Sequence, residues 1–412
     1  MLYYISSFNR VIMNNGNEVY QNAYTKLFIP YSESTEFKIT KILNQQLSKL
    51  ETSQPGIILQ LLAAELLYMG IIVPVEHKER EAEYLDSIIL FKQDDNTFFN
   101  LKSLTEYQLF SPSFNMKDVI FCGIPSDIGS DRPGTRFGPY ILRSGSRGMV
   151  SGMNGSVCCL DLQKLNNIFS NKNIYDVGNI NLPLNEASKY LEKVEYVSHL
   201  ISKKGRPFFI GGDHLFTLPI LKGIYSNRKN KNFTIVQLDS HLDIQVWGDF
   251  DNGYPKKLAV PDHSNFISWV KHCMPEISIL QIGINNYQGI SRSNLDNVTH
   301  YLDSIGQRIT NIEIFNNTQE YLKNKLPKNQ DIYLTIDVDV INSVYMPSTG
   351  YPGAVGINLE MIFFIIKTIC LYNNIIGVDI MEFAQSINRE FHSRMSNIIN
   401  SLILEILKGI YK

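Results

Sequence analysis

The sequence predicts an α/β protein with three layers, α/β/α, around a doubly wound parallel sheet, preceded by a small N-terminal α+β domain. From Val119 onward, short apolar runs alternate with segments that have the spacing of amphipathic helices, as expected for a parallel sheet covered on both faces. Clusters of Gly, Asp and His follow several of these runs, where such sheets carry their sites. Residues 1–112 have a different pattern, so we expect two domains, 1–112 and 113–412.

The composition is that of a globular protein that binds neither nucleic acid nor membranes. Of the 412 residues, 44% are hydrophobic and 19% are charged, and the net charge of −2 gives no attraction to nucleic acid or to an anionic membrane. The most apolar stretches, 57–73 and 359–371, are interrupted by polar residues and fall short of the roughly 18 residues of a membrane span. Five scattered cysteines and an N-terminus without a signal peptide predict a cytoplasmic location.

The first 112 residues are expected to form a winged-helix-like module. Apolar residues in two segments recur with helical spacing, and short β-prone runs flank these segments. The predicted elements are strands at 2–5, 19–20, 27–29, 71–73 and 87–91, and helices over 37–50 and 58–67. The last two strands enclose a charged turn, which would be the wing.

The charge of this module argues against DNA binding. Residues 1–110 hold 13 Asp and Glu against 9 Lys and Arg. The arrangement resembles the small peptide-recognition domains attached to enzymes that modify ribosomally made peptides, which bind a leader segment as an added edge strand. Two interpretations stay open for this module: a structural or oligomerisation extension, and a leader-peptide recognition domain.

The larger domain is predicted to alternate strands and helices to its end. Its predicted strands are 119–125, 174–178, 207–210, 235–238, 279–282, 334–337 and 377–381. Helices are expected to begin at Tyr140, to cover 191–201, and to close the chain near 395–407. The Gly- and Pro-rich loop at 126–139 is either an ordinary connection or one wall of a substrate site.

One short run marks the centre of the predicted site. Residues 235–238 have the character of a buried strand, and Asp239, His241 and Asp243 follow it at alternate positions. Alternate residues of an extended backbone project to one side, so these three side chains are expected to face one point. Carboxylates and imidazoles bind metals, although solvated loops also collect acidic residues. The run predicts a metal site, with an ordinary loop as the alternative.

Two further strand ends carry side chains of the same kind. His214 follows the predicted strand 207–210, and Asp337 and Asp339 close a later strand. Parallel strands end at one edge of a sheet, so all six side chains are expected to meet there, although each motif singly is also compatible with a plain turn. Two histidines and four aspartates suit two hard ions such as Mn²⁺, or another divalent ion, with Asp239 or Asp337 as the bridge. Such ions supply a hydroxide near neutral pH.

These motifs resemble those of the ureohydrolases, the family of arginase and agmatinase, from Asp118 to the C-terminus. The matches to the metal motifs of that family are Gly-Gly-Asp-His at 211–214, Asp-Ser-His-Leu-Asp at 239–243, and Asp-Val-Asp at 337–339 followed by 346–350. Residues 124–139 resemble the Pro-Gly-Arg-Phe-Gly-Pro loop of the family, and 377–383 resemble its late strand. All six ligand positions are filled, which makes the resemblance specific.

The resemblance implies hydrolysis of a guanidinium to an amine and urea at a pair of Mn²⁺ ions. Glu382 matches the Glu that contacts the guanidinium, a cation that stays protonated and needs a carboxylate partner. Asp243, besides being a ligand, matches the carboxylate that takes the proton of the hydroxide. His263 resembles a non-ligand histidine of the family and is a candidate proton shuttle, with a structural histidine as the alternative. Asn265, in the same segment, is a candidate substrate contact.

Departures from the arginase pattern bear on the substrate. The loop from Asp243 to His263 lacks the Asn and Ser with which arginase binds the α-carboxylate, and Gln245 stands nearest to one of those places. Residues 283–286 lack the acid that meets the α-amino group. An arginine within a peptide has neither charge. We therefore expect conversion of peptidyl arginine to ornithine in a precursor peptide whose leader is bound by residues 1–112.

Three other hypotheses remain open. The first is a small-molecule ureohydrolase that acts on agmatine, guanidinobutyrate or guanidine. The second is a peptide-binding adaptor on an inactive ureohydrolase scaffold, which the six intact ligand positions disfavour. The third is a zinc deacetylase on the related fold, which needs one metal and leaves His214 and Asp243 unexplained. A homo-oligomer is compatible with the resemblance, because members of the family are often trimers or hexamers.

Overall fold

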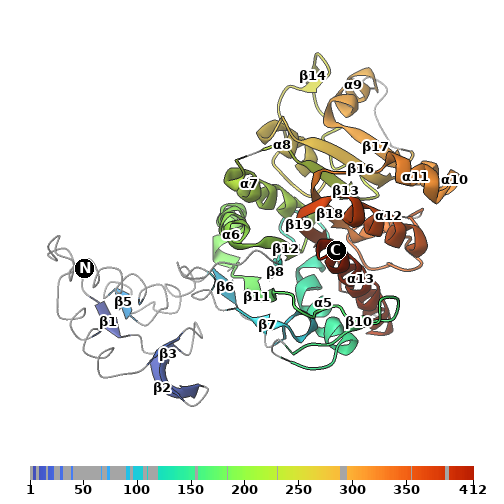
Figure 1. Cartoon of the computed structure of the whole chain (residues 1–412). Coiled ribbons are helices and arrows are strands. Elements are labelled where there is room, and N and C mark those ends of the chain that lie inside the picture. The colour runs from blue at the N-terminus through green and yellow to red at the C-terminus, as the bar shows by residue number, and fades with distance from the viewer. Residues whose placement is uncertain are drawn as a thin grey trace. The chain divides into compact units, whose positions relative to one another are not determined.

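The computed structural model describes residues 119–412 apart from 154–155, 183, 230, 288–294, 354 and 386–388. Before residue 119 it describes 3–5, 9–14, 17–22, 28–30, 39, 66, 72–74, 90–92, 96–104 and 109. The chain divides into two compact units, Met1–Lys92 with Thr105–Pro112, and Gln93–Leu104 with Ser113–Lys412 (Figure 1). The predicted domains, 1–112 and 113–412, stay a prediction; in this division the described residues 96–104 belong to the larger unit.

The smaller unit contains antiparallel strands. A three-stranded sheet is formed by β2 (Asn9–Asn14), β3 (Asn17–Asn22) and β4 (Phe28–Pro30), and β1 (Tyr3–Ile5) pairs with β5 (Ile72–Pro74). A further strand, β6, spans Phe91–Lys92. Ile39 and Leu66, one from each predicted helix, are helical and buried. The remainder of both helices and the winged-helix arrangement lie outside the described residues.

The centre of the larger unit is a parallel sheet. In spatial order its strands are β17 (Gln307–Thr310), β16 (Ser278–Ile284), β13 (Thr234–Leu238), β18 (Asp331–Asp337), β19 (Asn374–Met381), β12 (Arg206–Ile210), β8 (Val119–Gly123) and β11 (Ile174–Ile180). Each neighbouring pair in this order runs parallel, and β7 (Lys102–Ser103) pairs with β11 in the same direction. Two short hairpins lie outside the sheet: β9 (Leu160–Asp161) with β10 (Asn166–Asn167), and β14 (Phe250–Asp251) with β15 (Tyr254–Pro255).

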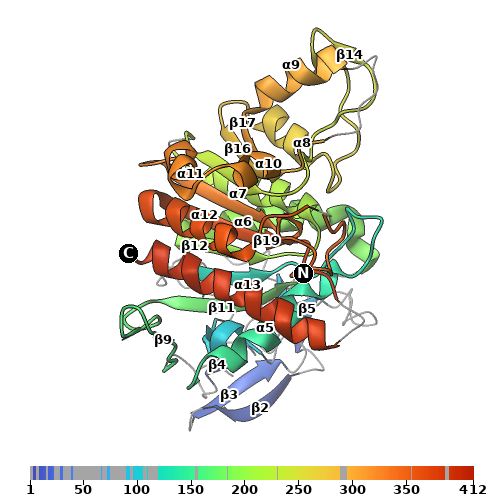
Figure 2. The same cartoon turned by 90° about the vertical axis from the view of Figure 1, so that its right-hand side faces the viewer.

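Helices cover both faces of this sheet (Figures 1 and 2). One layer contains α6 (Tyr190–Lys204), α7 (Thr217–Asn227) and α8 (Phe266–Cys273), and the other contains α5 (Gly138–Ser146), α11 (Gln319–Lys325), α12 (Leu359–Tyr372) and α13 (Arg389–Ile410). Two further helices, α9 (Leu295–Ile305) and α10 (Asn311–Asn316), precede and follow β17 in the chain. The predicted three-layer α/β/α architecture is confirmed.

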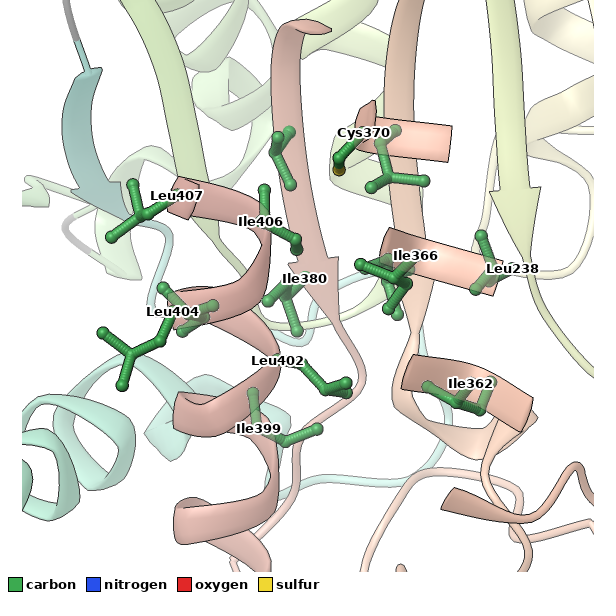
Figure 3. Close-up of a cluster of buried hydrophobic side chains, with 14 of the residues drawn as sticks. Leu238, Ile362, Ile366, Cys370, Ile380, Ile399, Leu402, Leu404, Ile406 and Leu407 are labelled. Carbon is green, nitrogen blue, oxygen red and sulfur yellow. The ribbon is translucent and has the colours of Figure 1, made fainter. Parts of the chain in front are cut away.

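The layer of α12 and α13 packs on the sheet through apolar side chains. α12 begins where the Asn358 side chain accepts a hydrogen bond from the Met361 N–H, which caps the helix. Buried side chains then recur on both helices at intervals of three or four residues and meet Ile380 of β19 (Figure 3). Those that Figure 3 labels include Ile362, Ile366, Cys370, Ile399, Leu402 and Ile406. Within the described part of the chain, every helix is too short or too polar to span a lipid bilayer.

A buried ion pair joins α5 to the edge of the sheet. Arg143 and Asp176 both have side chains with no exposed surface, and their contacts are bidentate, with Nε to Oδ2 at 2.9 Å and Nη2 to Oδ1 at 3.0 Å. Arg143 Nη2 also donates to the Gly178 carbonyl at 2.8 Å, and its guanidinium lies 4.8 Å from the Phe98 ring. Every charge in this group is therefore paired inside the protein.

We expect Arg143→Met to lower the free energy of unfolding by about 3–5 kcal/mol, because Asp176 would keep a buried charge without its cation. The free energy is measured by urea denaturation. Arg147→Met is the matched control, because this exposed arginine donates to the side chains of Asn96 and Asn100, and its loss should cost less than about 1 kcal/mol. Equal effects of the two substitutions would contradict the assignment.

Candidate metal centre

The proposed ligands come from strand ends at one edge of the sheet. β12, β13 and β18 belong to a run of adjacent parallel strands, so their carboxyl ends share that edge. His214 follows β12 after a tight turn, residues 239–243 follow β13, and Asp337 closes β18. The turn requires Gly212, because a Cβ there would lie 1.5 Å from the carbonyl oxygen of Ser126. The sheet thus brings three separated segments of the sequence together.

His214 lies among three carboxylates. Its Nδ1 is 3.0 Å from Asp239 Oδ2, 3.2 Å from Asp243 Oδ2 and 3.3 Å from Asp337 Oδ2, and all four residues are buried. Burial, and next the charge of Asp239, raises the pKa of Asp243 well above its ordinary value. Burial, followed by the charge of Asp339, does the same to the pKa of Asp337. These carboxylates repel one another, so a cation among their oxygens would stabilise them.

Hydrogen bonds behind His214 decide which ring nitrogen is free. Its Nε2 lies 2.9 Å from Thr335 Oγ1, and the Thr335 hydroxyl donates to Asp379 Oδ1 at 2.5 Å, so Nε2 is the donor in the first contact. Nδ1 faces the three carboxylates. Burial lowers the pKa of His214, but Asp239, Asp243 and Asp337 raise it well above its ordinary value, so positive charge is favoured at Nδ1, as a proton or as a metal ion that replaces it. The hydroxyls of Tyr333 and Thr217 also donate to Asp379 and hold its carboxylate. Nδ1 is therefore available to a cation held by the three neighbouring carboxylates.

A second group of ligands shares Asp239 with the first. His241 Nδ1 lies 2.9 Å from Asp339 Oδ2 and 3.7 Å from Asp239 Oδ1. The N–H and hydroxyl of Ser240 donate to Asp339 Oδ1 at 3.1 and 2.8 Å, and the His241 N–H donates to Asp239 Oδ1 at 2.7 Å. Of the two carboxylates predicted as a bridge, Asp239 has one oxygen near each histidine.

The residues present fit a pair of divalent cations. In His214, Asp239 and Asp243, and again in Asp239, His241 and Asp339, one ligand atom from each side chain lies within 4.8 Å of the others. Burial lowers the pKa of His241, but Asp339 raises it to about 10, so the local field attracts positive charge. Carboxylate oxygen with imidazole nitrogen is a donor set that suits Mn²⁺ and related ions.

Glu382 enters the same site from the end of β19. It has a left-handed backbone with a φ of 64°, and its N–H donates to the Gly212 carbonyl at 2.8 Å. Its Oε1 accepts a hydrogen bond from the His214 N–H at 2.9 Å, whereas Oε2 is buried without a partner. Burial, followed by Asp337 and Asp213, raises the pKa of Glu382 well above its ordinary value. Oε2 is thus an atom in place to receive a cationic group.

The structure separates the two predictions made for the segment after the long loop. His263 lines the pocket, and its Nδ1 donates to the Gly129 carbonyl at 2.6 Å, which leaves Nε2 for other partners. Asn265 is buried and does not line the pocket; its Oδ1 accepts from the Asp262 N–H and its Nδ2 donates to the Val260 carbonyl. The prediction that Asn265 contacts substrate is not supported, because its side chain turns inward to hold the loop.

A pocket of about 750 Å³ opens over these groups. Its lining includes Trp247, Tyr351 and, at the strand ends that we call its floor, five of the six predicted ligands: His214, His241, Asp243, Asp337 and Asp339. Among the described residues that line it, the charged ones, histidines aside, are all acidic: Asp131, Asp243, Asp262, Asp337, Asp339 and Glu382. Bound divalent ions would neutralise Asp243, Asp337 and Asp339, so the negative charge left to act on a substrate is that of Asp131, Asp262 and Glu382, which attracts cations.

Reasoning from the sequence missed a polar layer beneath the ligands. Gln237 Nε2 donates to Asp239 Oδ2 at 2.7 Å and to Asp243 Oδ2 at 3.1 Å, and Gln281 Nε2 donates to Gln237 Oε1 at 2.8 Å. Thr335 and Asp379 support His214 in the same way. All four lie inside buried, otherwise apolar strands, where a polar residue is costly unless it is hydrogen-bonded. That interruption of an apolar run is the signal that would have identified them.

Comparison with known proteins places these residues in a family. Residues 117–408 match the family described as the Arginase family. Agmatinase of Bacillus subtilis is 28% identical over 306 residues, 73% of this chain and 94% of the relative, and agmatinase of Blochmanniella floridana is 30% identical over 72% and 90%.

Solved structures agree in fold. The proclavaminate amidino hydrolase from Streptomyces clavuligerus superposes with a TM-score of 0.61 at 22% identity over 77% of this chain and 97% of that one. The agmatine ureohydrolase of Thermoplasma volcanium does so with a TM-score of 0.57 at 18% identity, over 80% and 98%. With a family match over most of its length, this chain belongs to the arginase family.

Proposed function

We propose that this protein is a binuclear manganese ureohydrolase that hydrolyses the guanidinium of a small guanidino compound to an amine and urea. The observation that carries the proposal is the convergence of six ligand side chains beside a buried carboxylate, Glu382, whose Oε2 has no partner. The residues that would hold the two ions are His214, Asp239, His241, Asp243, Asp337 and Asp339.

The arrangement of this chain's residues suits the reaction. Bound divalent ions supply a hydroxide near neutral pH and electrostatic stabilisation of the developing negative charge. Glu382 pairs with the guanidinium and orients its central carbon towards the floor of the pocket. The Asp243 carboxylate accepts the proton of the attacking water, and His263 passes a proton to the leaving nitrogen through Nε2, because Nδ1 is held by Gly129. One water is consumed, and urea and a protonated amine leave.

The pocket favours a substrate without an anionic group at its far end. Its acidic lining repels a carboxylate, and Gln245 cannot bind one, because its amide is used within its own loop. Gln245 Oε1 accepts from the Ala259 N–H at 2.7 Å, and Nε2 donates to the Lys257 carbonyl at 3.0 Å. Agmatine, which ends in an ammonium group, fits this field, and several similar proteins carry the name agmatinase.

Hydrolysis of peptidyl arginine, the substrate expected from the sequence, is the second candidate. The agmatinase relatives favour the small substrate, whereas residues 1–116 lie before the family match and leave room for a further role. An arginine inside a peptide also lacks a free carboxylate and satisfies the same field. A cytoplasmic location and a homo-oligomeric state stay predictions. Membership of the arginase family leaves the inactive adaptor and the zinc deacetylase without support.

We expect the negative charge of the pocket to affect the relative rates at which two guanidino substrates are hydrolysed. At pH 7.5 with Mn²⁺, urea release from agmatine should exceed that from 4-guanidinobutyrate at least about tenfold in kcat/KM, because the two differ in the charge of the distal group. An arginine-containing precursor peptide, weighed before and after incubation, serves as the third arm. Loss of about 42 Da per arginine (CN₂H₂) from the peptide, without urea from agmatine, would make peptidyl arginine the substrate.

We expect Asp239→Asn to abolish binding of at least one ion, because Asp239 belongs to both ligand groups. Bound manganese, measured after gel filtration, should fall from two ions per chain to one or fewer. Urea release should fall by more than the roughly 100-fold that loss of a supporting residue costs. Asp296→Asn, at an exposed position in the first turn of α9, is the control and should retain both ions. Two bound ions in Asp239→Asn would refute the assignment.

Glu382→Gln should separate substrate binding from metal binding. The variant keeps an oxygen for the His214 N–H but loses the charge that pairs with a guanidinium, so kcat/KM should fall about 30- to 1,000-fold. Bound manganese should stay at two ions per chain. Glu360→Gln, at the surface of α12, should leave both quantities unchanged. An unchanged kcat/KM in Glu382→Gln would remove this residue from the site.

A further inference from the structure

We propose that Tyr351 is a positioning residue for the His263 imidazole, and that Asp131 and Arg132 hold Tyr351 in place. This inference rests on the proposed function, in which His263 passes a proton to the leaving nitrogen. Tyr351 lies directly after residues 346–350, which match the family's motif. The structure places it in the wall of the pocket.

The Tyr351 ring contacts two histidines of the site. The His263 ring stacks on it, with 5.5 Å between centroids and 15° between planes. The His241 ring meets it edge-on, with 6.3 Å between centroids and an angle of 81°. A stacked neighbour restricts rotation of the imidazole plane. Tyr351 therefore occupies the space into which the His263 ring would otherwise turn.

The hydrogen bonds of His263 leave this rotation undetermined. Its N–H and its Nδ1–H both donate to the Gly129 carbonyl, at 3.2 and 2.6 Å. A single side-chain hydrogen bond places one nitrogen but permits the ring to rock about it. Proton transfer requires Nε2 within hydrogen-bond reach of the substrate nitrogen, so a second restraint on the ring plane reduces the entropy lost on reaching the transition state. The Tyr351 ring supplies that restraint.

Tyr351 is itself held by two neighbouring residues of one loop. Its hydroxyl donates to Asp131 Oδ1, and the Arg132 guanidinium carbon lies 3.9 Å from its ring centroid. Arg132 Nη1 also donates to the Gly350 carbonyl at 2.9 Å, so it restrains the backbone that carries the tyrosine. The ring thus has a cation against it, an acceptor for its hydroxyl and a histidine stacked on it. These contacts together fix the position of the Tyr351 ring in the wall of the pocket.

The rival role for Tyr351 is direct contact with the substrate. The two roles differ in kinetics, because a lost substrate contact raises KM, whereas a misplaced proton shuttle lowers kcat. They differ also in coupling. A residue that acts through His263 has no further effect once His263 is replaced, whereas an independent contact costs the same in both backgrounds.

The test is a double-mutant cycle on the full-length, Mn²⁺-loaded protein, with urea release from agmatine as the readout. Tyr351→Leu should lower kcat about 10- to 100-fold and change KM less than about threefold. Tyr351→Phe keeps the ring but loses the hydrogen bond to Asp131, so its kcat should lie between that of wild type and that of Tyr351→Leu. In the His263→Asn background, Tyr351→Leu should lower kcat less than about twofold. Equal losses in both backgrounds, or a rise in KM alone, would overturn the proposal.

A second measurement does not depend on turnover. The His263 ring-proton resonance is assigned, by its absence in His263→Asn, in an NMR spectrum of ¹⁵N-histidine-labelled full-length protein loaded with diamagnetic Mg²⁺, because Mn²⁺ would broaden resonances this close to the ions. Stacking on Tyr351 should shift this resonance upfield, and the shift should disappear in Tyr351→Leu and persist in Tyr351→Phe. An unchanged resonance in Tyr351→Leu would overturn the positioning role. If wild type released urea from no guanidino compound, the proposed function would fail, and the spectrum alone would decide the placement of His263.

Discussion

The site depends on the concentration of negative charge at one buried edge of the sheet. Four aspartates and Glu382 lie together at this edge. Burial raises the pKa of Asp243, Asp337 and Glu382 well above the ordinary values. Backbone and amide donors offset part of this repulsion, among them the Gln237 amide and the N–H of His241. Cations bound among these oxygens would relieve the remainder, which would link metal binding, stability and the preference for a guanidinium.

The parallel sheet stabilises this concentration of charge, because the side chains that hydrogen-bond to the ligands and to one another come from several adjacent strands. β13, β18 and β19 are adjacent, so Gln237, Thr335 and Asp379 form a polar layer directly before the strand ends that carry the ligands. All three residues are buried; Thr335 donates to Asp379, and Gln237 accepts from Gln281 of β16. The ligands therefore emerge from a scaffold whose side chains are already fixed, which reduces the cost of ordering them around an ion.

The sequence predicted the ligands better than their surroundings, for a physical reason. Asp239, His241 and Asp243 follow an apolar strand abruptly, and strand ends of a parallel sheet must meet, so six residues could be placed together without any side-chain detail. The role of Asn265 as a substrate contact stays a prediction. The direction of a loop side chain depends on which carbonyl lies nearby, here that of Val260, and the sequence does not show this. Tyr351 could not be found, because its partners come from loops that meet only in the folded chain.

The strand ends carry the residues proposed for the reaction, whereas the loops carry the residues that would select the substrate. The floor of the pocket is built from strand ends, where a displaced side chain would disturb several neighbours in the sheet. The rest of the lining comes from loops with internal hydrogen bonds, such as those of the Gln245 amide to Ala259 and Lys257. Substitutions in such loops disturb few other parts of the protein. A chain can thus keep the guanidinium-binding floor of its family while the rest of the lining changes. In this chain the described lining residues outside the floor include Asp131 and Asp262 but no lysine or arginine, which is the observation that the proposed preference for a substrate with a distal cation rests on.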